Sequence, residues 1–349
     1  MGAPAAAQRP SFVSLGMVVL DELRFPDRPS LHDVPGGSGA FSVLGARLVA
    51  GQERAGQVGC FILAGNDFPE SALRSFRSWG VNLDIQVDPA RPSTRGLLEY
   101  KDSSFGRKTF RYTTTPLHPS PRDLPAHFLE SASFHILALP SQLADHVRDL
   151  ASLRPGAPVL DPPLLVWEPT PPHCSQQTKD DHMAACKHVD VFSPNHLELL
   201  AFFQDSKPAE GASHFDPQAI EACADAFLES GIGPSDKGTV VVRAGEYGCL
   251  VSSFTIEGRH RWLPAFYADA SSVVDATGGG NTFLGAFTYA MAACNKSPVD
   301  AAALANVAAT FALEQIGTPT LEKVEGQRER WNGSEFDTRF QAYQQMLSR

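Results

Sequence analysis

The segment with the clearest chemistry is 274–287, which reads VDATGGGNTFLGAF. Three consecutive glycines, Gly278, Gly279 and Gly280, stand where an apolar helix is expected to begin. Glycines at a helix start let backbone N–H groups converge on an anion, which the positive end of the helix dipole also attracts. The pattern therefore predicts a phosphate site. The structural alternative is an ordinary turn in which Asn281 caps the helix, because Asn is a favoured N-cap residue.

Residue types that bind metals gather in one segment, which contains His173, Cys174, His182, Cys186 and His188. A helix would place His182 and Cys186 on one face, as two metal ligands would be. Their spacing matches no common zinc module, and the segment also reads as an ordinary helix leading into a strand. The six cysteines are scattered without a CxxC pair, which favours reduced thiols in a cytosolic protein.

The composition is that of a globular protein and disfavours nucleic-acid and membrane partners. The chain has 349 residues, of which 43% are hydrophobic and 19% charged, so a sizeable core is available. The net charge of −10 disfavours general nucleic-acid binding, which rests on neutralising phosphates. No apolar run approaches the length of a membrane span, and the N-terminus lacks the apolar core of a secretory signal. We expect a cytoplasmic protein with no membrane or nucleic-acid partner.

The elements that must position these residues are short apolar strands alternating with helices. After a disordered start (residues 1–10), the run 11–23 reads as a first strand. The runs FHILAL, APVLD, VDVFSP and GTVVVRAG are typical of strands buried in a parallel sheet. The proline-rich stretch 154–173 reads as an ordered loop or linker. This alternation predicts one α/β domain over 11–349, with a doubly wound, mostly parallel sheet that binds ligands at the carboxyl ends of its strands.

One segment departs from this rhythm. Residues 93–117 read as two strands around a polar Ser-Ser-Phe-Gly turn, and a hairpin inserted among βα units suggests a flap. Together with residues around 17–35, we expect it to form a small β lid over the edge of the main sheet.

The glycine segment resembles the second signature of the PfkB/ribokinase-like carbohydrate kinases, whose usual form is D-T-x-G-A-G-D-x-F. The resemblance implies that Gly278–Gly280 form an anion hole for the transferred phosphoryl group, and that Asp275 is the leading aspartate. The family's catalytic base, an aspartate, falls on Asn281. Because an amide cannot take the acceptor's proton, catalysis is expected to be altered or weakened. On this basis alone, Asn281→Asp is predicted to raise turnover.

The resemblance extends over about residues 11–320. Gly36-Gly37 is similar to the first signature, where a glycine pair lets the chain approach a bound sugar. Phe41 stands where the family usually has an asparagine, which implies a more apolar or different acceptor. Asp21 matches the acidic residue that commonly holds acceptor hydroxyls.

On the nucleotide side, Asn195 and Glu198 match the N-x-x-E motif, which implies Mg²⁺ held near Glu198. Their spacing is also that of a capping box, which needs no metal. The stretch 240–248 resembles the strand and turn that admit ATP, with Arg243, Gly245 and Gly248 beside the nucleotide; an ordinary hairpin is the alternative. A last residue, Asn306, would lie on the helix that flanks the adenine.

The GGGN sequence and the missing asparagine are similar to the fungal killer-maintenance (Mak-type) branch of this family. The resemblance implies an ATP-dependent phosphotransferase, with ATP and Mg²⁺, acting on a hydroxyl of a sugar-like or other small polar molecule. Two alternatives stay open: a pseudokinase that binds a small ligand or nucleotide as a scaffold or sensor, and an enzyme repurposed for other chemistry in the same pocket. A homodimer through the lid is expected, and the need for a monovalent cation is left open.

Overall fold

The computed structural model describes residues 9–101, 108–154, 161–203 and 215–348. The expected disordered start therefore lies outside the described residues except for Arg9 and Pro10. The same holds for the Ser-Ser-Phe-Gly turn and for all of the expected strand APVLD except Asp161.

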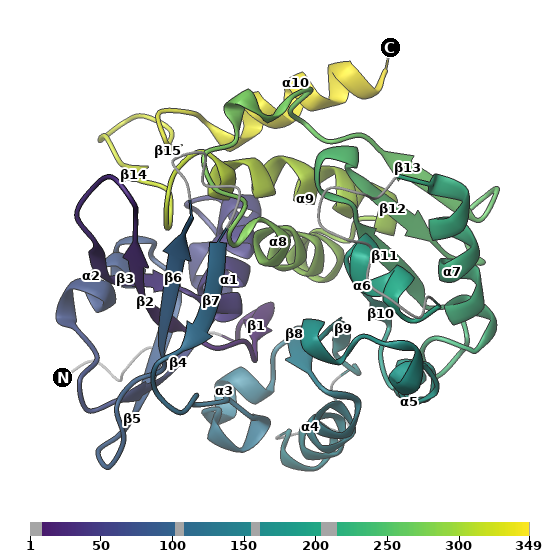
Figure 1. Cartoon of the computed structure of the whole chain (residues 1–349), viewed down its shortest axis with the longest axis horizontal. Helices are drawn as coiled ribbons and strands as arrows, with labels where there is room; N and C mark the ends of the chain where they lie inside the picture. Colours follow the sequence, from purple (N-terminus) through teal and green to yellow (C-terminus); the bar gives the residue numbers. More distant parts are fainter. Residues whose placement is uncertain (1–8, 102–107, 155–160, 204–214, 349) are drawn as a thin grey trace.

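The main sheet has nine strands in the described part of the chain, ordered β13-β12-β11-β10-β9-β8-β1-β4-β5 (Figure 1). The seven strands from β5 to β11 are parallel to their neighbours, while β12 and β13 are antiparallel. From β1 the chain builds outward in both directions, so the topological switch lies between β1 and β8. The strands are β1 (Phe12–Ser14), β4 (Val58–Gly65), β5 (Asn82–Asp88), β8 (Ser133–Ala138), β9 (Leu164–Pro169), β10 (Val191–Phe192), β11 (Thr239–Arg243), β12 (Cys249–Ser252) and β13 (His260–Leu263).

Helices cover both faces of this sheet, and each face has its own apolar core. One core contains side chains of α1, α2, α8 and α9, with α10 packed outside α9. The other contains side chains of α3 to α7. The helices are α1 (Gly37–Ala50), α2 (Glu70–Ser78), α3 (Ala126–Leu129), α4 (Pro140–Leu153), α5 (Lys179–Cys186), α6 (His196–Ala201), α7 (Pro217–Glu229), α8 (Gly279–Cys294), α9 (Pro298–Leu313) and α10 (Phe336–Leu347).

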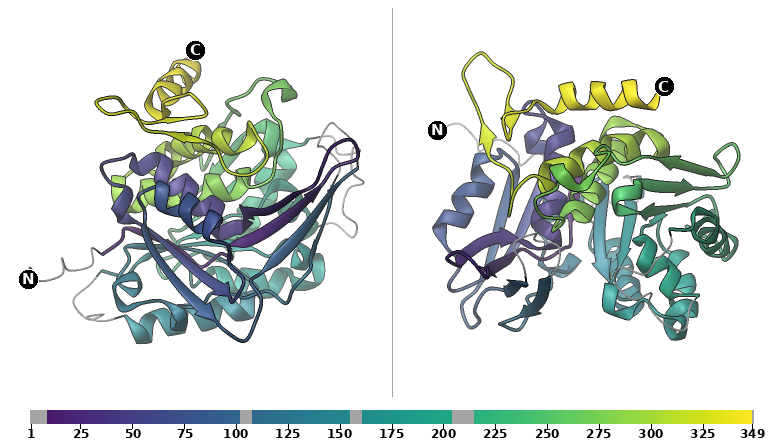
Figure 2. Two further views of the ribbon diagram at one scale, coloured as in Figure 1. Left: turned by 90° about the vertical axis from the view of Figure 1, so that its left-hand side faces the viewer. Right: turned by 45° about the horizontal axis from the view of Figure 1, so that its top comes forward.

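A second sheet of four strands, ordered β3-β2-β6-β7, stands beside the main sheet as a lid (Figure 2). Its strands are β2 (Val19–Arg24), β3 (Leu31–Gly36), β6 (Arg95–Tyr100) and β7 (Lys108–Tyr112). A two-stranded ribbon, β14 (Leu321–Glu322) with β15 (Arg330–Trp331), precedes α10. The predicted fold class, a doubly wound, mostly parallel sheet flanked by helices with a small β lid, is confirmed.

The run 11–23 is two strands in two different sheets, which corrects the expectation of one strand. The chain leaves the main sheet after Ser14 and enters the lid at Val19. Gly16 lies at the break, where a Cβ would meet Ser38 Oγ at 2.5 Å and the backbone of α1. The apolar run is continuous because both sheets are buried there, so hydrophobicity alone could not mark the crossing.

The proline-rich stretch 154–173 contains β9, a central strand between β8 and β10, so its interpretation as a loop or linker was wrong for 164–169. The prolines flank or end the strand, where a missing N–H breaks no ladder, and the residues between them are buried. This correction matters because β9 supplies a central residue of the site.

The residues of metal-binding type between 173 and 188 do not gather into one cluster in the described structure. His182 is buried, with Nδ1 2.7 Å from the Thr178 carbonyl and its ring stacked on Trp167. Among the described residues, no group of three or more His, Cys, Asp or Glu could hold a metal ion. In the same described ranges, no helix is long and apolar enough to cross a membrane.

Candidate functional site

The glycine segment begins α8. Gly278 is the N-cap residue with φ of 82°, in the left-handed region that favours glycine. A Cβ on Gly278 would collide with the ring of Phe41, so the α8 terminus and α1 approach each other more closely than any other residue allows. Asn281 lies in the first helical turn and is not the N-cap, so the capping alternative is wrong. Its side chain is left available for other contacts.

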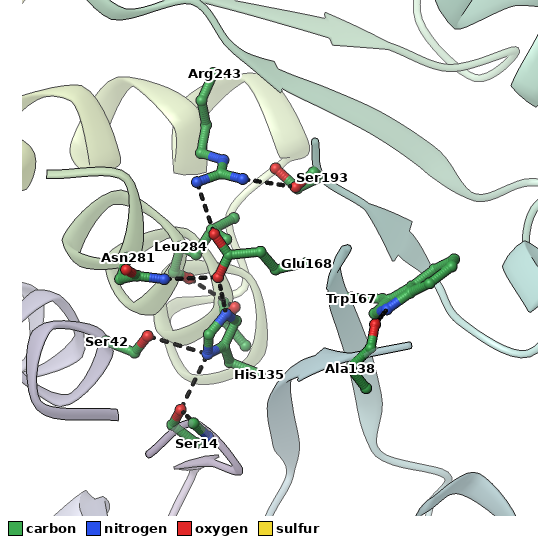
Figure 3. A network of polar contacts seen from close by, with 12 residues as sticks. Ser14, Ser42, His135, Ala138, Trp167, Glu168, Ser193, Arg243, Asn281 and Leu284 are labelled. Atoms are coloured by element: carbon green, nitrogen blue, oxygen red, sulfur yellow. Dashed lines mark hydrogen bonds and ion pairs between the residues drawn. The ribbon is translucent and has the colours of Figure 1, made fainter. Parts of the chain in front are cut away.

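Glu168, at the end of β9, is the centre of a buried polar network (Figure 3). Its Oε2 accepts a hydrogen bond of 2.6 Å from Asn281 Nδ2 and lies 3.1 Å from His135 Nε2. Its Oε1 pairs with Arg243 Nη1 at 2.8 Å. Burial alone would raise the pKa of Glu168, but Arg243 and His135 outweigh it and hold the pKa below its usual value. Glu168 is therefore a carboxylate anion beside the glycine helix.

His135, at the centre of β8, anchors Glu168 from within the core. Its side chain is completely buried, and its Nδ1 lies 3.0 Å from the hydroxyl oxygens of both Ser14 and Ser42. Because a carboxylate only accepts hydrogen bonds, Nε2 carries the proton and donates to Glu168. Strand alternation explains the arrangement, since His135 and Glu168 point to the sheet face covered by α1 and α8.

Neither His135 nor Glu168 was predicted as a site residue. The signal available in the sequence was one polar residue within an otherwise apolar strand, FHILAL for His135 and LLVWEP for Glu168. Buried charged groups are rare unless paired, so such a residue marks a network. For Glu168 the signal was lost when its strand was interpreted as a loop.

Arg243, at the end of β11, brings a positive charge to the glycines. Nη2 donates to the Ser193 carbonyl at 3.0 Å and lies 3.6 Å from Glu198 Oε2. A Cβ on Gly280 would lie 2.5 Å from Nη1, so the guanidinium rests directly against the start of α8. Arg243, which the sequence placed only beside the nucleotide, thus lies against the glycines that begin α8.

Asn195 and Glu198 form the capping box of α6, the alternative that needs no metal. Asn195 N donates to Glu198 Oε2 at 2.8 Å, Asn195 Nδ2 donates to Glu198 Oε1 at 2.6 Å, and Glu198 N donates to Asn195 Oδ1 at 2.8 Å. Both carboxylate oxygens of Glu198 are therefore engaged, and Arg243 lies nearby. These residues do not fit a directly coordinated Mg²⁺ ion, which needs several free oxygen ligands.

The remaining nucleotide-side residues lie in a hairpin and a helix. Gly245 and Gly248 form the turn between β11 and β12, so the hairpin alternative is present. A Cβ on Gly248 would collide with the Leu263 carbonyl, whereas Gly245 faces open space. Asn306 is buried in α9, where its Nδ2 donates to the Pro264 carbonyl at 3.2 Å and lies 2.8 Å from the hydroxyl of Tyr343. The side-chain amide of Asn306 therefore connects α9 to α10 and to the segment that follows β13.

Asp21, in lid strand β2, is a buried carboxylate with an unmet hydrogen-bonding capacity. Asp21 is 6% exposed, and its Oδ1 has no hydrogen-bond partner among the described residues. Burial raises the pKa of Asp21 to about 7. Gly36 and Gly96 flank it, and a Cβ on either would collide with a carboxylate oxygen. Gly37, which begins α1, has φ of 84° and lies against the Met17 carbonyl.

The lid is fastened to the glycine loop through Asp275. Tyr100 donates to Asp275 Oδ2 at 2.6 Å, and Lys108 Nζ pairs with Oδ1 at 2.6 Å. Lys108 also contacts the hydroxyl of Thr277. Burial would raise the pKa of Asp275, but the hydrogen bonds from Lys108 and Tyr100 outweigh it, so the pKa lies below the usual value. These contacts join the four-stranded lid, which carries Asp21, to the segment that leads into α8.

Comparison with known proteins shows to which family the chain belongs. A family model described as pfkB family carbohydrate kinase matches residues 16–323. The chain belongs to this family. Protein MAK32 of Saccharomyces cerevisiae is 30% identical over 351 residues, covering 95% of this chain and 91% of that protein. This relative supports the resemblance to the killer-maintenance branch.

Two further proteins are similar to this chain. A cytidine kinase of Thermococcus kodakarensis is 25% identical over 277 residues, covering 79% of this chain and 86% of that protein. The structure of a ribokinase from Cryptococcus neoformans in complex with ADP has a TM-score of 0.63. It is 22% identical, and the match covers 90% of this chain and 96% of that one. That likeness shows the ribokinase-like fold.

Within the family frame, the two sequence departures have different structural settings. Phe41 is 3% exposed and packs against Gly278, so its ring fills space at the root of the glycine loop. Asn281 stays partly accessible and is fixed by Glu168. The first residue fills space beside the glycine loop, whereas the second places a neutral amide, hydrogen-bonded to the Glu168 carboxylate, in the first turn of α8.

Proposed function

We propose that this chain is an ATP-dependent phosphotransferase that acts on a hydroxyl of a sugar-like or other small polar molecule. The observation that carries the proposal is the hydrogen bond from Asn281 to Glu168. Because the carboxylate requires a donor, it fixes Nδ2 toward Glu168 and leaves Oδ1 as an acceptor. No donor among the described residues pairs with that oxygen. Asn281 thus offers the hydrogen-bond-accepting half of the family's aspartate.

The residues divide the reaction between them. Asp21 accepts hydrogen bonds from the acceptor molecule, and Asn281 Oδ1 accepts one from the reacting hydroxyl. The hydroxyl oxygen of the acceptor attacks the γ-phosphorus of ATP, while the bond between that phosphorus and the ADP oxygen breaks. The proton leaves to water or to a phosphate oxygen, since an amide cannot retain it. Turnover is then expected to be lower than with an aspartate base by about 10²–10⁴-fold, the usual contribution of general-base catalysis.

Two sources of positive charge, the N-terminus of α8 and the Arg243 guanidinium, lie together and support the proposed binding of the ATP phosphates. The N–H groups at the start of α8 attract an anion together with the helix dipole. Arg243 adds a guanidinium at Gly280, a charge that suits phosphate oxygens. Mg²⁺ would neutralise phosphate charge when bound to the nucleotide and water, since Glu198 and Asn195 engage each other.

The test is a search for ATP-dependent product by mass spectrometry, with a library of hydroxyl-bearing metabolites. A phosphorylated acceptor that disappears with Arg243→Gln and with Asp21→Asn supports the proposal. Binding of ATP with no product from any acceptor in the library contradicts it. Thermal shift with ATP and Mg²⁺ provides the separate measure of nucleotide binding.

A second function is the binding of a ligand without phosphoryl transfer. It is favoured because the carboxylate oxygens of Glu168 and Glu198 are already engaged in hydrogen bonds and ion pairs. Glu168 accepts from three side chains and has a lowered pKa, so it is a poor base. Both carboxylate oxygens of Glu198 already accept hydrogen bonds from Asn195. A nucleotide-dependent rise in melting temperature without product would identify this pseudokinase.

We also propose that two copies associate through the lid, because its outer strands β3 and β7 each have one edge without a pairing strand in the described part of the chain. Sedimentation of the intact chain tests this assembly. A monomer at micromolar concentration would exclude it.

A further inference from the structure

The lid carries two half-exposed aromatic rings beside the buried carboxylate. Phe110 is 49% exposed and Tyr112 is 42% exposed, although both are large apolar side chains. Their rings lie 4.9 Å apart at 82°, so they form two walls of a corner. Contiguous exposed apolar surface marks interaction or ligand-binding sites, whereas apolar residues exposed singly are normal.

Sheet register places this corner on the same face as Asp21. Asp21 pairs with Gly96, Gly96 pairs with Tyr112, and Phe110 lies two residues before Tyr112 on one strand. A Cβ on Gly96 would collide with Asp21 Oδ1 and lie 2.6 Å from the Phe110 ring. The carboxylate and the ring are therefore neighbours across one glycine. Burial and the Asp21 charge raise the pKa of Tyr112, which agrees with this proximity.

The same face looks toward the glycine helix. Tyr100 follows Gly96 by four residues on β6, so both point to one side, and Tyr100 reaches Asp275 before α8. Lys108 precedes Phe110 by two residues on β7 and reaches the same aspartate. The aromatic corner thus faces the α8 side of the lid, next to a carboxylate whose Oδ1 has no partner among the described residues.

We propose that the acceptor is a polyol joined to a flat aromatic ring, the chemistry of a nucleoside. Its hydroxyl groups donate to Asp21, while its ring stacks in the corner of Phe110 and Tyr112. A plain sugar would satisfy the carboxylate but leave both aromatic rings largely in water. The inference rests on the proposed phosphotransfer and deepens it by naming the class of acceptor.

The experiment measures binding by calorimetry without ATP, using cytidine, adenosine and ribose as probes. At least one nucleoside is expected to bind at least about 10-fold more tightly than ribose, given the usual worth of stacking on an aromatic side chain. The Phe110→Ala/Tyr112→Ala variant should lose this preference. Phe110→Leu/Tyr112→Leu, which keeps apolar bulk and guards against misfolding, should lose most of it. The matched control is Thr109→Ala/Arg111→Ala, on the other face of β7, which should keep the preference.

Each result decides one of the two proposals. Nucleoside binding without any ATP-dependent product keeps this inference and defeats the phosphotransfer. Phosphorylation of ribose as readily as of nucleosides supports the phosphotransfer and overturns the inference about the acceptor. Equal affinity for ribose and nucleosides, or no binding of any probe, overturns the inference. So does a nucleoside preference that survives in both ring-free variants. If those variants change only the sedimentation of the protein, the corner is a contact between copies and the inference is also overturned.

Discussion

The side-chain amide of Asn281 donates a 2.6 Å hydrogen bond to the buried carboxylate of Glu168. The two residues are 113 positions apart and come from the first turn of α8 and the end of β9. Glu168 is in turn held by Arg243 and His135. The first turn of α8 therefore carries a neutral amide at position 281, and the negative charge lies one hydrogen bond away, on the sheet. This relationship changes what substitutions at position 281 should do.

Asn281→Asp alone is expected to reduce stability and leave turnover low, which reverses the expectation from sequence alone. Two carboxylates at hydrogen-bond distance repel, and one of them must bind a proton. The double variant Asn281→Asp/Glu168→Gln moves the charge to α8 and restores a donor on β9, so turnover should rise about 10-fold or more over the native chain. A double-mutant cycle of unfolding free energy and turnover measures this coupling. Additive effects of the two changes would contradict it.

Asp21→Asn is expected to stabilise the ligand-free protein above pH 7. The pKa is about 7 when folded and near 3.8 when unfolded, so between these values the folded state binds more protons. Stability should therefore fall as pH rises from about 4 to about 7 and then level off. Because each pKa unit is worth about 1.4 kcal/mol, the variant gains up to about 4 kcal/mol at pH 8.

Urea unfolding at several pH values measures the Asp21 effect, with Glu22→Gln, the next residue along β2, as the control. The native chain and Glu22→Gln should share the slope between pH 4 and pH 7, and Asp21→Asn should lack it. Acceptor binding should be lost in Asp21→Asn at every pH. A destabilised Asp21→Asn protein at pH 8 would mean that the carboxylate is paired.

Lys108→Met is expected to loosen the lid from the glycine loop. The change removes one donor from buried Asp275, so unfolding free energy at pH 7 should drop by about 1–3 kcal/mol. Because the folded pKa of Asp275 is lowered, this stabilisation exists above the usual carboxyl range and disappears as pH falls below it. The native chain and Lys108→Met should then converge as pH falls below the lowered pKa of Asp275. Lys101→Met, at an exposed position of the lid, should match the native protein throughout.

Gly280→Ala is expected to lower ATP affinity by about 10-fold or more while the fold persists. The new Cβ meets only the flexible end of Arg243, which must leave the phosphate site. Gly279 is the poorer test, since a side chain there meets Leu313 of α9 at 2.7 Å and perturbs the contact between α8 and α9. Calorimetric titration with ATP measures the effect, and Arg243→Lys should weaken binding in the same direction because it loses the two-pronged donor. Unchanged affinity in both variants would remove Arg243 and Gly280 from the nucleotide site.

Much of the fold could be predicted from local pattern. Alternating apolar strands and helices indicate a doubly wound sheet, and the 93–117 hairpin indicates a lid. The failures have local causes as well. The run 11–23 crosses between sheets without losing its apolar character, and β9 lies among prolines that only its neighbours show to be at strand ends.

The sequence by itself determined which residue types are present: three glycines at a helix start, an asparagine after them, and an aspartate at the end of an apolar run. Each of these is a property of a few consecutive residues. Only the tertiary structure decided their meaning, because His135, Glu168 and Arg243 come from three strands and meet Asn281 through sheet order and side-chain alternation. Likewise, Phe110 and Asp21 become neighbours only through the register of β2, β6 and β7. Charge and shape at the site are sums over residues far apart in the chain, and folding alone brings those contributions within the few ångströms over which they act.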